Sequence, residues 1–494
     1  MFFNTTNING LNYYNTKQME INNQYFYVKQ LPTGCLSQYA YYIESNKEAV
    51  VIDPIRDIQQ YIDLVKSRNA TLKYVIDTHI HADFVSGYCD LAKKTGAQVV
   101  IGPKDEITFS HIRGDDGKIL NLGEIDLKLI HTPGHTLESI CILLINKKEG
   151  NKQEAVFTGD TLFVGDVGRP DLAVKSGKIT KRDLTDHLFD SLKKLVVLDD
   201  NCKVMPGHGA GSACGKNLGS ESYSTIGEQK TANYALKIKD KDEFYNALVE
   251  GLPLPPDYFF HDVSMNLNND KIKTADEILA LGKTGLVPEK VEELIKNPDY
   301  VIIDTRDSPD FVDGHVPSSI NVPLKFNTAI WAASIIEVSK RIIVVCYAEK
   351  VEESILRLAR TGMDNIDGYL KDGIEAWTNA GKSLATLKKV KPAEIPEHLN
   401  GSGKCTIVDV RNDNEIEAGT LQDAHFLHLD NVNKKAEENF DKNTTLFVMC
   451  RSGARAIVAS SILQRQGYDV RVIEGGFVAA KEHGLKIKYP KLVK

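Results

Sequence analysis

The sequence predicts an α/β protein in which one large layered domain is followed by two copies of a smaller α/β domain. Three observations predict this arrangement. The chain has 494 residues, the length of about three ordinary domains. Short β-rich runs alternate with helical segments along its first half. An internal repeat then occupies the second half.

Composition excludes several classes of protein. There are 67 acidic and 60 basic residues, a formal charge of −7 without long runs of one sign, so we expect neither nucleic acid nor a membrane as a partner. No apolar run approaches the roughly 20 residues of a membrane helix. The eight cysteines include no C-x-x-C pair and are expected to be thiols in a reducing compartment.

The first 18 residues contain neither arginine nor an apolar core, which is unlike a secretory signal. We therefore expect the cytoplasm, with the mitochondrial matrix as the alternative. Translation could begin at Met1 or at Met19.

The first domain is predicted over residues 20–250. Its strand-like runs are residues 49–53, 74–77, 98–102 and 155–157, and residues 58–67 form a helical segment. A linker is predicted over residues 251–270, because Gly251–Asp257 holds three prolines, which stop helices and central strands.

The repeat defines the two remaining domains. Residues 301–306 align on residues 406–411, and a strand ending at Cys346 matches one ending at Cys450. We therefore predict related domains over 271–387 and 388–494, with the boundary near the basic stretch 388–392.

A group of metal-ligand residues follows the strand at 74–77. Alternate residues of an extended chain point the same way, so His79, His81 and Asp83 can converge. Three later loops of similar design supply His135, Asp160 and His208. A single such histidine is more often a turn residue, but the set predicts a metal site.

In the order and spacing of these ligands the first domain resembles the metallo-β-lactamase superfamily, which implies an αββα sandwich. Phe84 stands where members with two metal ions have a histidine. Because a phenyl ring cannot ligate a metal, one metal ion is expected rather than two.

That departure, together with the segments 165–171 and 209–215, resembles the persulfide dioxygenase branch and its fusions with tandem rhodanese domains. The resemblance implies one Fe(II) on His79, His135 and Asp160. The remaining three, His81, Asp83 and His208, would then lie beside the ligands without binding the metal. Two histidines and one carboxylate leave coordination positions for a substrate sulfur and O₂.

Two further residues of this domain have open roles. The resemblance places Arg169 against the carboxylate of the thiol carrier, and a salt bridge with Asp166 or Asp171 that fixes the loop is the alternative. Cys214 is either a persulfide relay near the metal or a small buried loop residue.

In the last domain a predicted strand ends in the loop Cys450–Arg455, followed by a helix. The loop amides, the helix N-terminus and the charges of Arg451 and Arg455 favour a thiolate. The loop resembles that of rhodanese sulfurtransferases, which implies that Cys450 carries sulfane sulfur. Protein phosphatases use a similar loop that is one residue longer.

The middle copy lacks these features. Cys346 is followed by acidic residues, and the loop contains no glycine. Acidic neighbours disfavour a thiolate and repel anionic sulfur donors such as thiosulfate. We therefore expect a catalytically silent domain with Cys346 buried.

Together these features predict an iron persulfide dioxygenase that converts a thiol persulfide, such as glutathione persulfide, and O₂ to sulfite and thiol. The sulfurtransferase could then yield thiosulfate, as part of sulfide detoxification. A glyoxalase II-like thiolester hydrolase fused to a sulfurtransferase is the alternative, and a sulfur carrier with an idle metal domain is the second. Relatives imply a homodimer or homotetramer.

Overall fold

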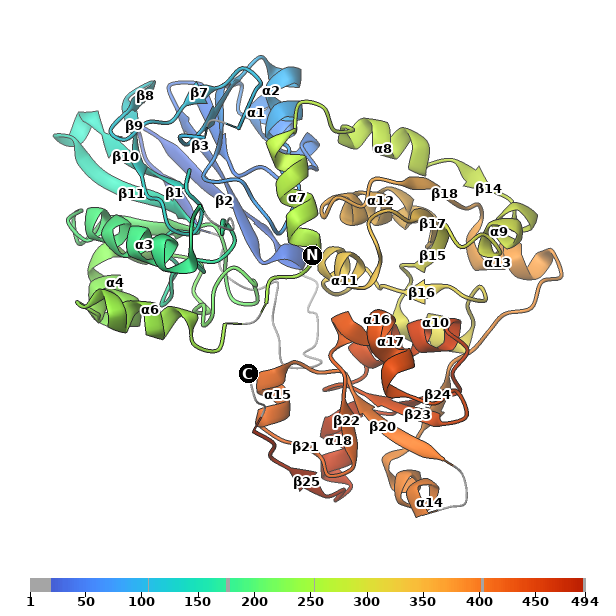
Figure 1. Cartoon of the computed structure of the whole chain (residues 1–494). Helices are drawn as coiled ribbons and strands as arrows, with labels where there is room; N and C mark the ends of the chain where they lie inside the picture. Colours follow the sequence, from blue (N-terminus) through green and yellow to red (C-terminus); the bar gives the residue numbers. More distant parts are fainter. Residues whose placement is uncertain (1–18, 105, 175–177, 253, 401–403, 492–494) are drawn as a thin grey trace. The chain divides into compact units, whose positions relative to one another are not determined.

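The computed structural model describes residues 19–104, 106–174, 178–252, 254–400 and 404–491. The chain divides into two compact units, one reaching to Ile272 and the other starting at Lys273 (Figure 1). Five buried apolar clusters of the described residues each lie within one unit. None of the described helices is long and apolar enough to cross a membrane.

The first unit contains two β-sheets. The described strands of the first sheet follow chain order and comprise β1 (Glu20–Asn22), β2 (Tyr27–Thr33), β3 (Gln38–Ser45), β4 (Glu48–Ile52), β5 (Thr71–Asp77), β6 (Gln98–Ile101) and β7 (Ile112–Arg113). The second sheet has the order β13-β12-β11-β10-β9-β8, with β8 (Ile119–Leu122), β9 (Ile125–His131), β10 (Ile140–Asn146), β11 (Lys152–Gly159), β12 (Lys203–Pro206) and β13 (Ser224–Thr225).

Strand β10 shows why the sheets stack in layers. Its sequence is apolar on both faces, as expected for a strand covered on both sides. Ile142 and Leu144 belong to the core between the two sheets, whereas Cys141 and Leu143 pack in the cluster that contains Leu188 of α3. Each face of the strand is therefore buried against a different layer.

Helices complete the layers of the first unit. α1 (Gln59–Ser67) and α2 (Tyr88–Thr95) lie beside the first sheet, and α3 (Lys181–Leu195), α4 (Ile226–Ala232) and α6 (Lys241–Val249) lie beside the second. α5 (Tyr234–Lys237) packs in the same buried cluster as the second sheet. The result is the αββα sandwich that the sequence predicted. The expected strands of the first domain correspond to β4, β5, β6 and β11, and the expected helix corresponds to α1.

One helix lies in the range expected to be a linker. Residues 251–270 include α7 (Tyr258–Leu267), which buries Asp262 and Asn266 completely within the first unit. Pro255 and Pro256 precede this helix, where they do not interrupt its hydrogen bonds, and Pro253 lies outside the described residues. Part of the expected linker is therefore integral to the metal-ligand domain.

The second unit begins with a parallel sheet of order β14-β18-β17-β15-β16. Its described elements are α8 (Ala275–Gly282), β14 (Gly285–Leu286), α9 (Pro288–Ile295), β15 (Tyr300–Asp304), α10 (Ser308–Asp313), β16 (Ile320–Asn321), α11 (Thr328–Ile335), β17 (Arg341–Val345), α12 (Val351–Ala359), β18 (Ile366–Leu370) and α13 (Gly373–Asn379).

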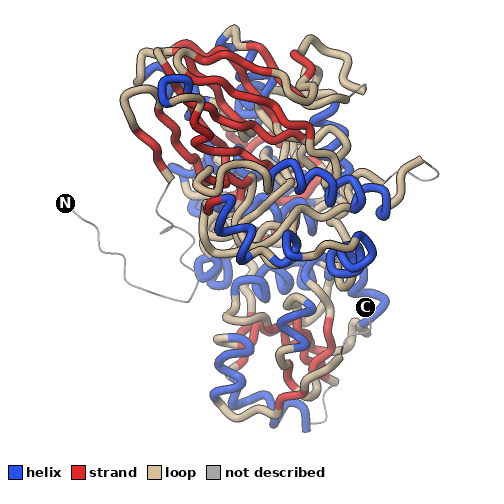
Figure 2. Tube along the Cα trace, turned by 90° about the vertical axis from the view of Figure 1, so that its left-hand side faces the viewer, coloured by secondary structure: helices blue, strands red, loops and turns tan. Residues whose placement is uncertain are grey.

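The last part of the chain repeats this order as β19-β24-β23-β20-β22. Its described elements are β19 (Lys388–Val390), α14 (Ile395–Asn400), β20 (Cys405–Asp409), α15 (Asp413–Glu417), β22 (Ala424–Phe426), α16 (Leu429–Asn439), β23 (Thr445–Met449), α17 (Ala454–Arg465), β24 (Val470–Ile473), α18 (Gly476–Glu482) and the small pair β21 (Thr420–Leu421) and β25 (Ile487–Lys488). Figure 2 shows its strands running between helices. One face packs with α16 and α17 and the other with α14 and α18.

A shared ion pair explains the repeated D-x-R motif. In the middle copy, Arg306 binds both carboxylate oxygens of Asp304 and donates to a carbonyl oxygen at 2.9 Å. In the last copy, Arg411 binds Asp409 in the same way and donates to the Gly419 carbonyl at 2.8 Å. The motif is structural in both copies, and the two predicted rhodanese-like domains are confirmed as folds.

Candidate metal centre and cysteine loop

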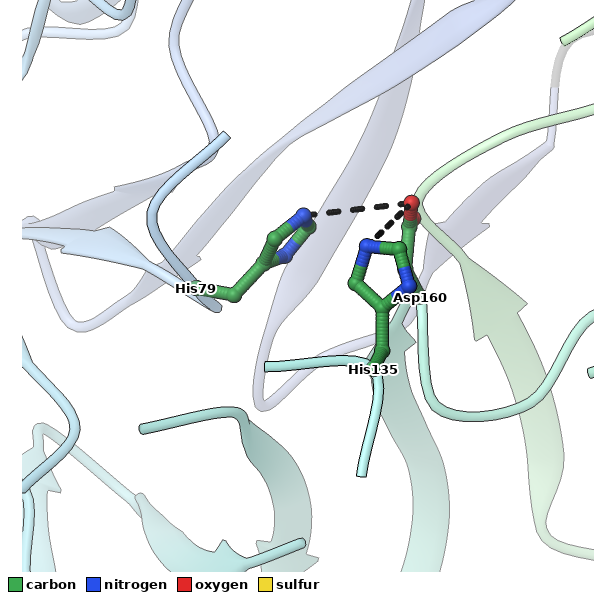
Figure 3. A group of neighbouring side chains, drawn as sticks. All are labelled: His79, His135 and Asp160. Atoms are coloured by element: carbon green, nitrogen blue, oxygen red, sulfur yellow. Dashed lines mark ion pairs between the residues drawn. The ribbon is translucent and has the colours of Figure 1, made fainter. Parts of the chain in front are cut away.

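The ends of β5, β9 and β11 bring three predicted ligands together: His79, His135 and Asp160 (Figure 3). The Nε2 atoms of the two histidines lie 3.8 and 3.5 Å from Oδ2 of Asp160. One ligand atom of each residue lies within 4.8 Å of the others, and all three side chains are buried. We refer to these three residues as the metal triad.

Unpartnered atoms test whether the triad fits a metal ion. Nε2 of His79 and Oδ2 of Asp160 are buried without a hydrogen-bond partner. Leaving such atoms unpaired costs about 1–3 kcal/mol each. Since both atoms point into the same space (Figure 3), a bound cation would satisfy both, and this donor set suits Fe(II) or another first-row metal.

Hydrogen bonds hold the two histidine rings with Nε2 toward the centre. Nδ1 of His135 donates to the carbonyl oxygen of Arg169 at 2.9 Å. Nδ1 of His79 lies 3.0 Å from the Thr78 hydroxyl, which itself donates to Asp53. Partners of this kind fix the tautomer of a ligating histidine and leave Nε2 free for the metal.

The ionisation of the triad also suits a metal site. Burial lowers the pKa of His79 far below its usual value and lowers that of His135. Burial by itself would raise the pKa of Asp160, but His208 and His79 outweigh it and lower the pKa strongly. Neutral imidazoles and an ionised carboxylate are the forms that bind metals.

His81 does not join the triad. Its Nε2 lies 3.2 Å from Oδ1 of Asp53, and a second buried cluster contains Asp53, Asp77 and His81. Burial lowers the pKa of His81, but the two carboxylates outweigh it and raise the value to about 9. The ring of Phe84, which is fully buried, lies against that of His81.

The other two residues expected beside the ligands also contact each other. His208 lies 2.8 Å from Oδ1 of Asp160 through Nδ1 and 2.8 Å from Oδ2 of Asp83 through Nε2. Cys214 belongs to the same buried cluster as Asp83 and His208, and burial raises the pKa of its thiol well above the usual value. Cys214 is thus a buried loop cysteine close to the triad, and a relay role stays a prediction.

Arg169 makes the loop-fixing salt bridge that was the alternative to substrate binding. Its guanidinium binds both oxygens of Asp171, at 2.7 and 2.9 Å, and its side chain is 1% exposed. A further bond reaches the carbonyl oxygen of Ala213. Substrate contact by Arg169 stays a prediction.

In the last domain, Cys450 lies at the end of β23, just before α17. The backbone N–H of Gly453 donates to its sulfur at 3.1 Å, and the helix N-terminus follows directly. Amides and the helix dipole favour negative charge on such a sulfur. Of the predicted favourable contacts, the Gly453 amide and the nearby helix N-terminus are therefore observed.

The two arginines of this loop differ. Arg455 binds both oxygens of Glu415, at 2.6 and 2.9 Å. Arg451 instead lines a cavity of about 600 Å³ beside the loop, together with Phe477 and Lys481. Arg451 is thus available to an entering anion, whereas the charge of Arg455 is already paired.

The middle copy has no equivalent loop. The residues after Cys346 form a short 3-10 helix, Ala348–Lys350, which continues into α12. Burial is the main cause that raises the pKa of Cys346, to about 12. Its burial agrees with the expectation of a structural cysteine.

Sequence reasoning missed three residues that shape these sites. Asp53 follows β4 and holds His81 and Thr78, and an aspartate at a strand end beside a metal motif was an available signal. Glu415 pairs with Arg455, and Asn266 bonds the loop of the metal motif. No local pattern indicates the last two, because their partners are distant in sequence.

Comparisons with known proteins agree with this division. The metallo-β-lactamase superfamily matches residues 33–208, and the rhodanese-like domain matches 287–380 and 391–483. A metallo-β-lactamase structure from Staphylococcus aureus subsp. aureus COL shares 31% identity, with a TM-score of 0.62, over 70% of this chain and 99% of that chain.

Two other relatives resemble the first unit. A hydroxyacylglutathione hydrolase of Pelagibacter ubique (strain HTCC1062) is 32% identical over 47% of this chain and 89% of its own length. The structure of ETHE1 from Myxococcus xanthus is 30% identical with a TM-score of 0.41, over 49% of this chain and 97% of that chain.

Proposed function

Because the chain belongs to the metallo-β-lactamase superfamily in its first unit and carries two rhodanese-like domains in its second, we propose that it is a metal-dependent enzyme that acts on sulfur atoms bound to thiols. One centre oxidises a low-molecular-weight thiol persulfide, such as glutathione persulfide, and Cys450 transfers sulfane sulfur. The geometry that carries the first reaction is the metal triad with Phe84 beside it, in place of a second-metal ligand.

The overall oxidation consumes one persulfide, one O₂ and one water and gives thiol, sulfite and two protons. A bound Fe(II) supplies the redox chemistry and the open coordination positions that this reaction needs. His79 and His135 present neutral nitrogens, and Asp160 presents a carboxylate oxygen. His208 holds the other oxygen of Asp160 at 2.8 Å, and burial of all four side chains excludes bulk water.

The transfer step uses Cys450 as the nucleophile. Its thiolate attacks the outer sulfur of a persulfide, the S–S bond of the donor breaks, and the donor leaves as a thiolate. Sulfite can then attack the outer sulfur of the Cys450 persulfide, which releases thiosulfate and restores the Cys450 thiolate. The Gly453 amide stabilises negative charge on this sulfur.

A thiolester hydrolase of the glyoxalase II type is the second candidate for the first unit. The names of the curated relatives favour it over the dioxygenase, since several are hydroxyacylglutathione hydrolases. A bound metal would then supply an activated water. The burial of Phe84 against His81 argues for one metal ion, whereas the resemblance implies two for this hydrolase.

One experiment separates the candidates. The full chain is purified without O₂, its metal content is measured, and O₂ uptake with glutathione persulfide is compared with hydrolysis of a glutathione thiolester. We expect one iron per chain and O₂ uptake that His79→Ala abolishes and Cys450→Ser retains. Bound zinc with rapid thiolester hydrolysis and no O₂ uptake would establish the hydrolase, and unchanged persulfide turnover in His79→Ala would leave only a sulfur carrier.

A further inference from the structure

The loop between β5 and α2 carries the metal motif, and helix α7 bonds to its backbone. The side chain of Asn266 in α7 makes three hydrogen bonds to this loop. Its Nδ2 donates to the carbonyl oxygens of His81 and Phe84, both at 2.8 Å. Its Oδ1 accepts from the backbone N–H of Ser86 at 2.9 Å. Asn266 is fully buried and lies outside residues 33–208, which match the superfamily.

A carboxamide suits this position closely. Two backbone carbonyls need two donors, and one backbone amide needs an acceptor, which is what the asparagine side chain offers. Aspartate has no N–H to donate, and alanine would leave three backbone groups buried without partners. Each such group costs about 1–3 kcal/mol, so the loop would have to rearrange in either variant.

Neighbouring residues strengthen the same contact. Nδ2 of Asn269 donates to the carbonyl oxygen of Ser86 at 2.8 Å, and its Oδ1 accepts from the amide of Cys89 at 3.2 Å. The hydroxyl of Tyr88 donates to the backbone oxygen of Asn266. Hydrogen bonds from α7 and from Asn269, just after it, therefore reach the loop and the start of α2, from His81 to Cys89.

We propose that Asn266 is a positioning residue for the metal triad. Its hydrogen bonds fix the carbonyl groups of His81 and Phe84, and thereby the backbone that places the Phe84 ring against His81. Nε2 of His81 in turn faces Asp53. His79 lies two residues before His81 on the same loop and is aimed at Asp160. This inference rests on the proposed one-metal centre.

Metal binding by the full-length protein tests the proposal without reference to turnover. Wild type, Asn266→Ala and Asn266→Asp are freed of metal and titrated with Co²⁺, followed by its visible absorption, and with Fe²⁺ in competition with a chelator. We expect the affinity of the folded variants to fall about 10–100-fold, as for other groups that orient metal ligands. The control is Asn268→Ala, an exposed residue next to the end of α7 whose side chain bonds the Ser264 carbonyl, and it should bind as the wild type does.

Three outcomes are distinguishable. A wild type that binds no metal refutes the proposed function itself. A wild type that binds one metal, with folded Asn266 variants of equal affinity, refutes the positioning role and leaves the function intact. Lower thermal stability with unchanged affinity would likewise show that Asn266 is only structural.

A measurement on the wild type covers the case in which both variants fail to fold. If Asn266 rather than the metal holds the loop, the Ser86 amide is protected from hydrogen exchange in the metal-free protein as strongly as in the loaded protein. Fast exchange of this amide without metal would overturn the proposal.

Discussion

The ring of Phe84 lies against the imidazole of His81, with 4.2 Å between the ring centroids and 36° between the ring planes. The contact occupies the position at which a second-metal ligand is expected in dinuclear relatives. On the same imidazole, Nε2 lies 3.2 Å from Oδ1 of Asp53. In the proposed function, this pair is the reason to expect one metal ion rather than two.

Replacing Phe84 by histidine should admit a second metal ion. The new imidazole would lie beside His81, whose ring now contacts that of Phe84, and next in sequence to Asp83. We expect the metal content of Phe84→His, measured by mass spectrometry of the elements, to rise from one toward two ions per chain. Phe84→Leu is the matched control and should keep one, and a content of one in both variants would contradict this account.

Gly207 should be intolerant of a side chain because Asp160 lies so close. A Cβ at this position would lie 2.6 Å from Oδ1 of Asp160, the oxygen that His208 also contacts. We expect Gly207→Ala to weaken metal affinity about 10–100-fold by displacing that carboxylate, measured by chelator competition. Gly285→Ala, whose Cβ would lie nearest to the flexible side chain of Lys371, at 3.2 Å, should leave the affinity unchanged.

The two strand-end cysteines should differ in sulfur transfer. Cys450→Ser is expected to reduce transfer from thiosulfate or a persulfide to the background rate, because the nucleophile is gone. Cys346→Ser should retain it, since burial holds that thiol protonated with a pKa of about 12. Transfer to cyanide can be followed as thiocyanate, and loss of activity in Cys346→Ser alone would reverse the assignment.

The pair of Glu415 and Arg455 should stabilise the last domain in a pH-dependent way. Burial raises the pKa of Glu415, but Arg455 outweighs it, so the net pKa is below its ordinary value. A carboxyl group with a lowered pKa stabilises the fold above its unfolded pKa and loses that contribution as pH falls through the folded value.

Glu415→Gln should therefore lower the free energy of unfolding at pH 7, by about 1–3 kcal/mol for a charged hydrogen-bonded pair. The deficit should shrink as the pH falls below about 4.3, the unfolded value for glutamate, because the wild type then loses the same interaction. Thermal unfolding followed by circular dichroism checks this, and a deficit independent of pH would contradict it.

Much of the architecture could be predicted because its signals are local. Strand and helix periodicity and the repeated D-x-R motif each act within a few residues. The candidate metal ligands were also local signals, since His79, His135 and Asp160 lie within four residues of a strand end, and the family resemblance then singled out these three. Each of these strands places its ligand at the edge of the sheet.

The sequence by itself determined the three α/β domains and a set of six candidate metal-site residues, from which the family resemblance selected the metal triad. Only the tertiary structure decided what those residues pair with. His81 turns to Asp53, Arg455 to Glu415, and Asn266 bonds a loop 180 residues away in sequence. These pairs form because packing brings buried polar groups within hydrogen-bond distance of each other. No local sequence pattern indicates which groups will meet.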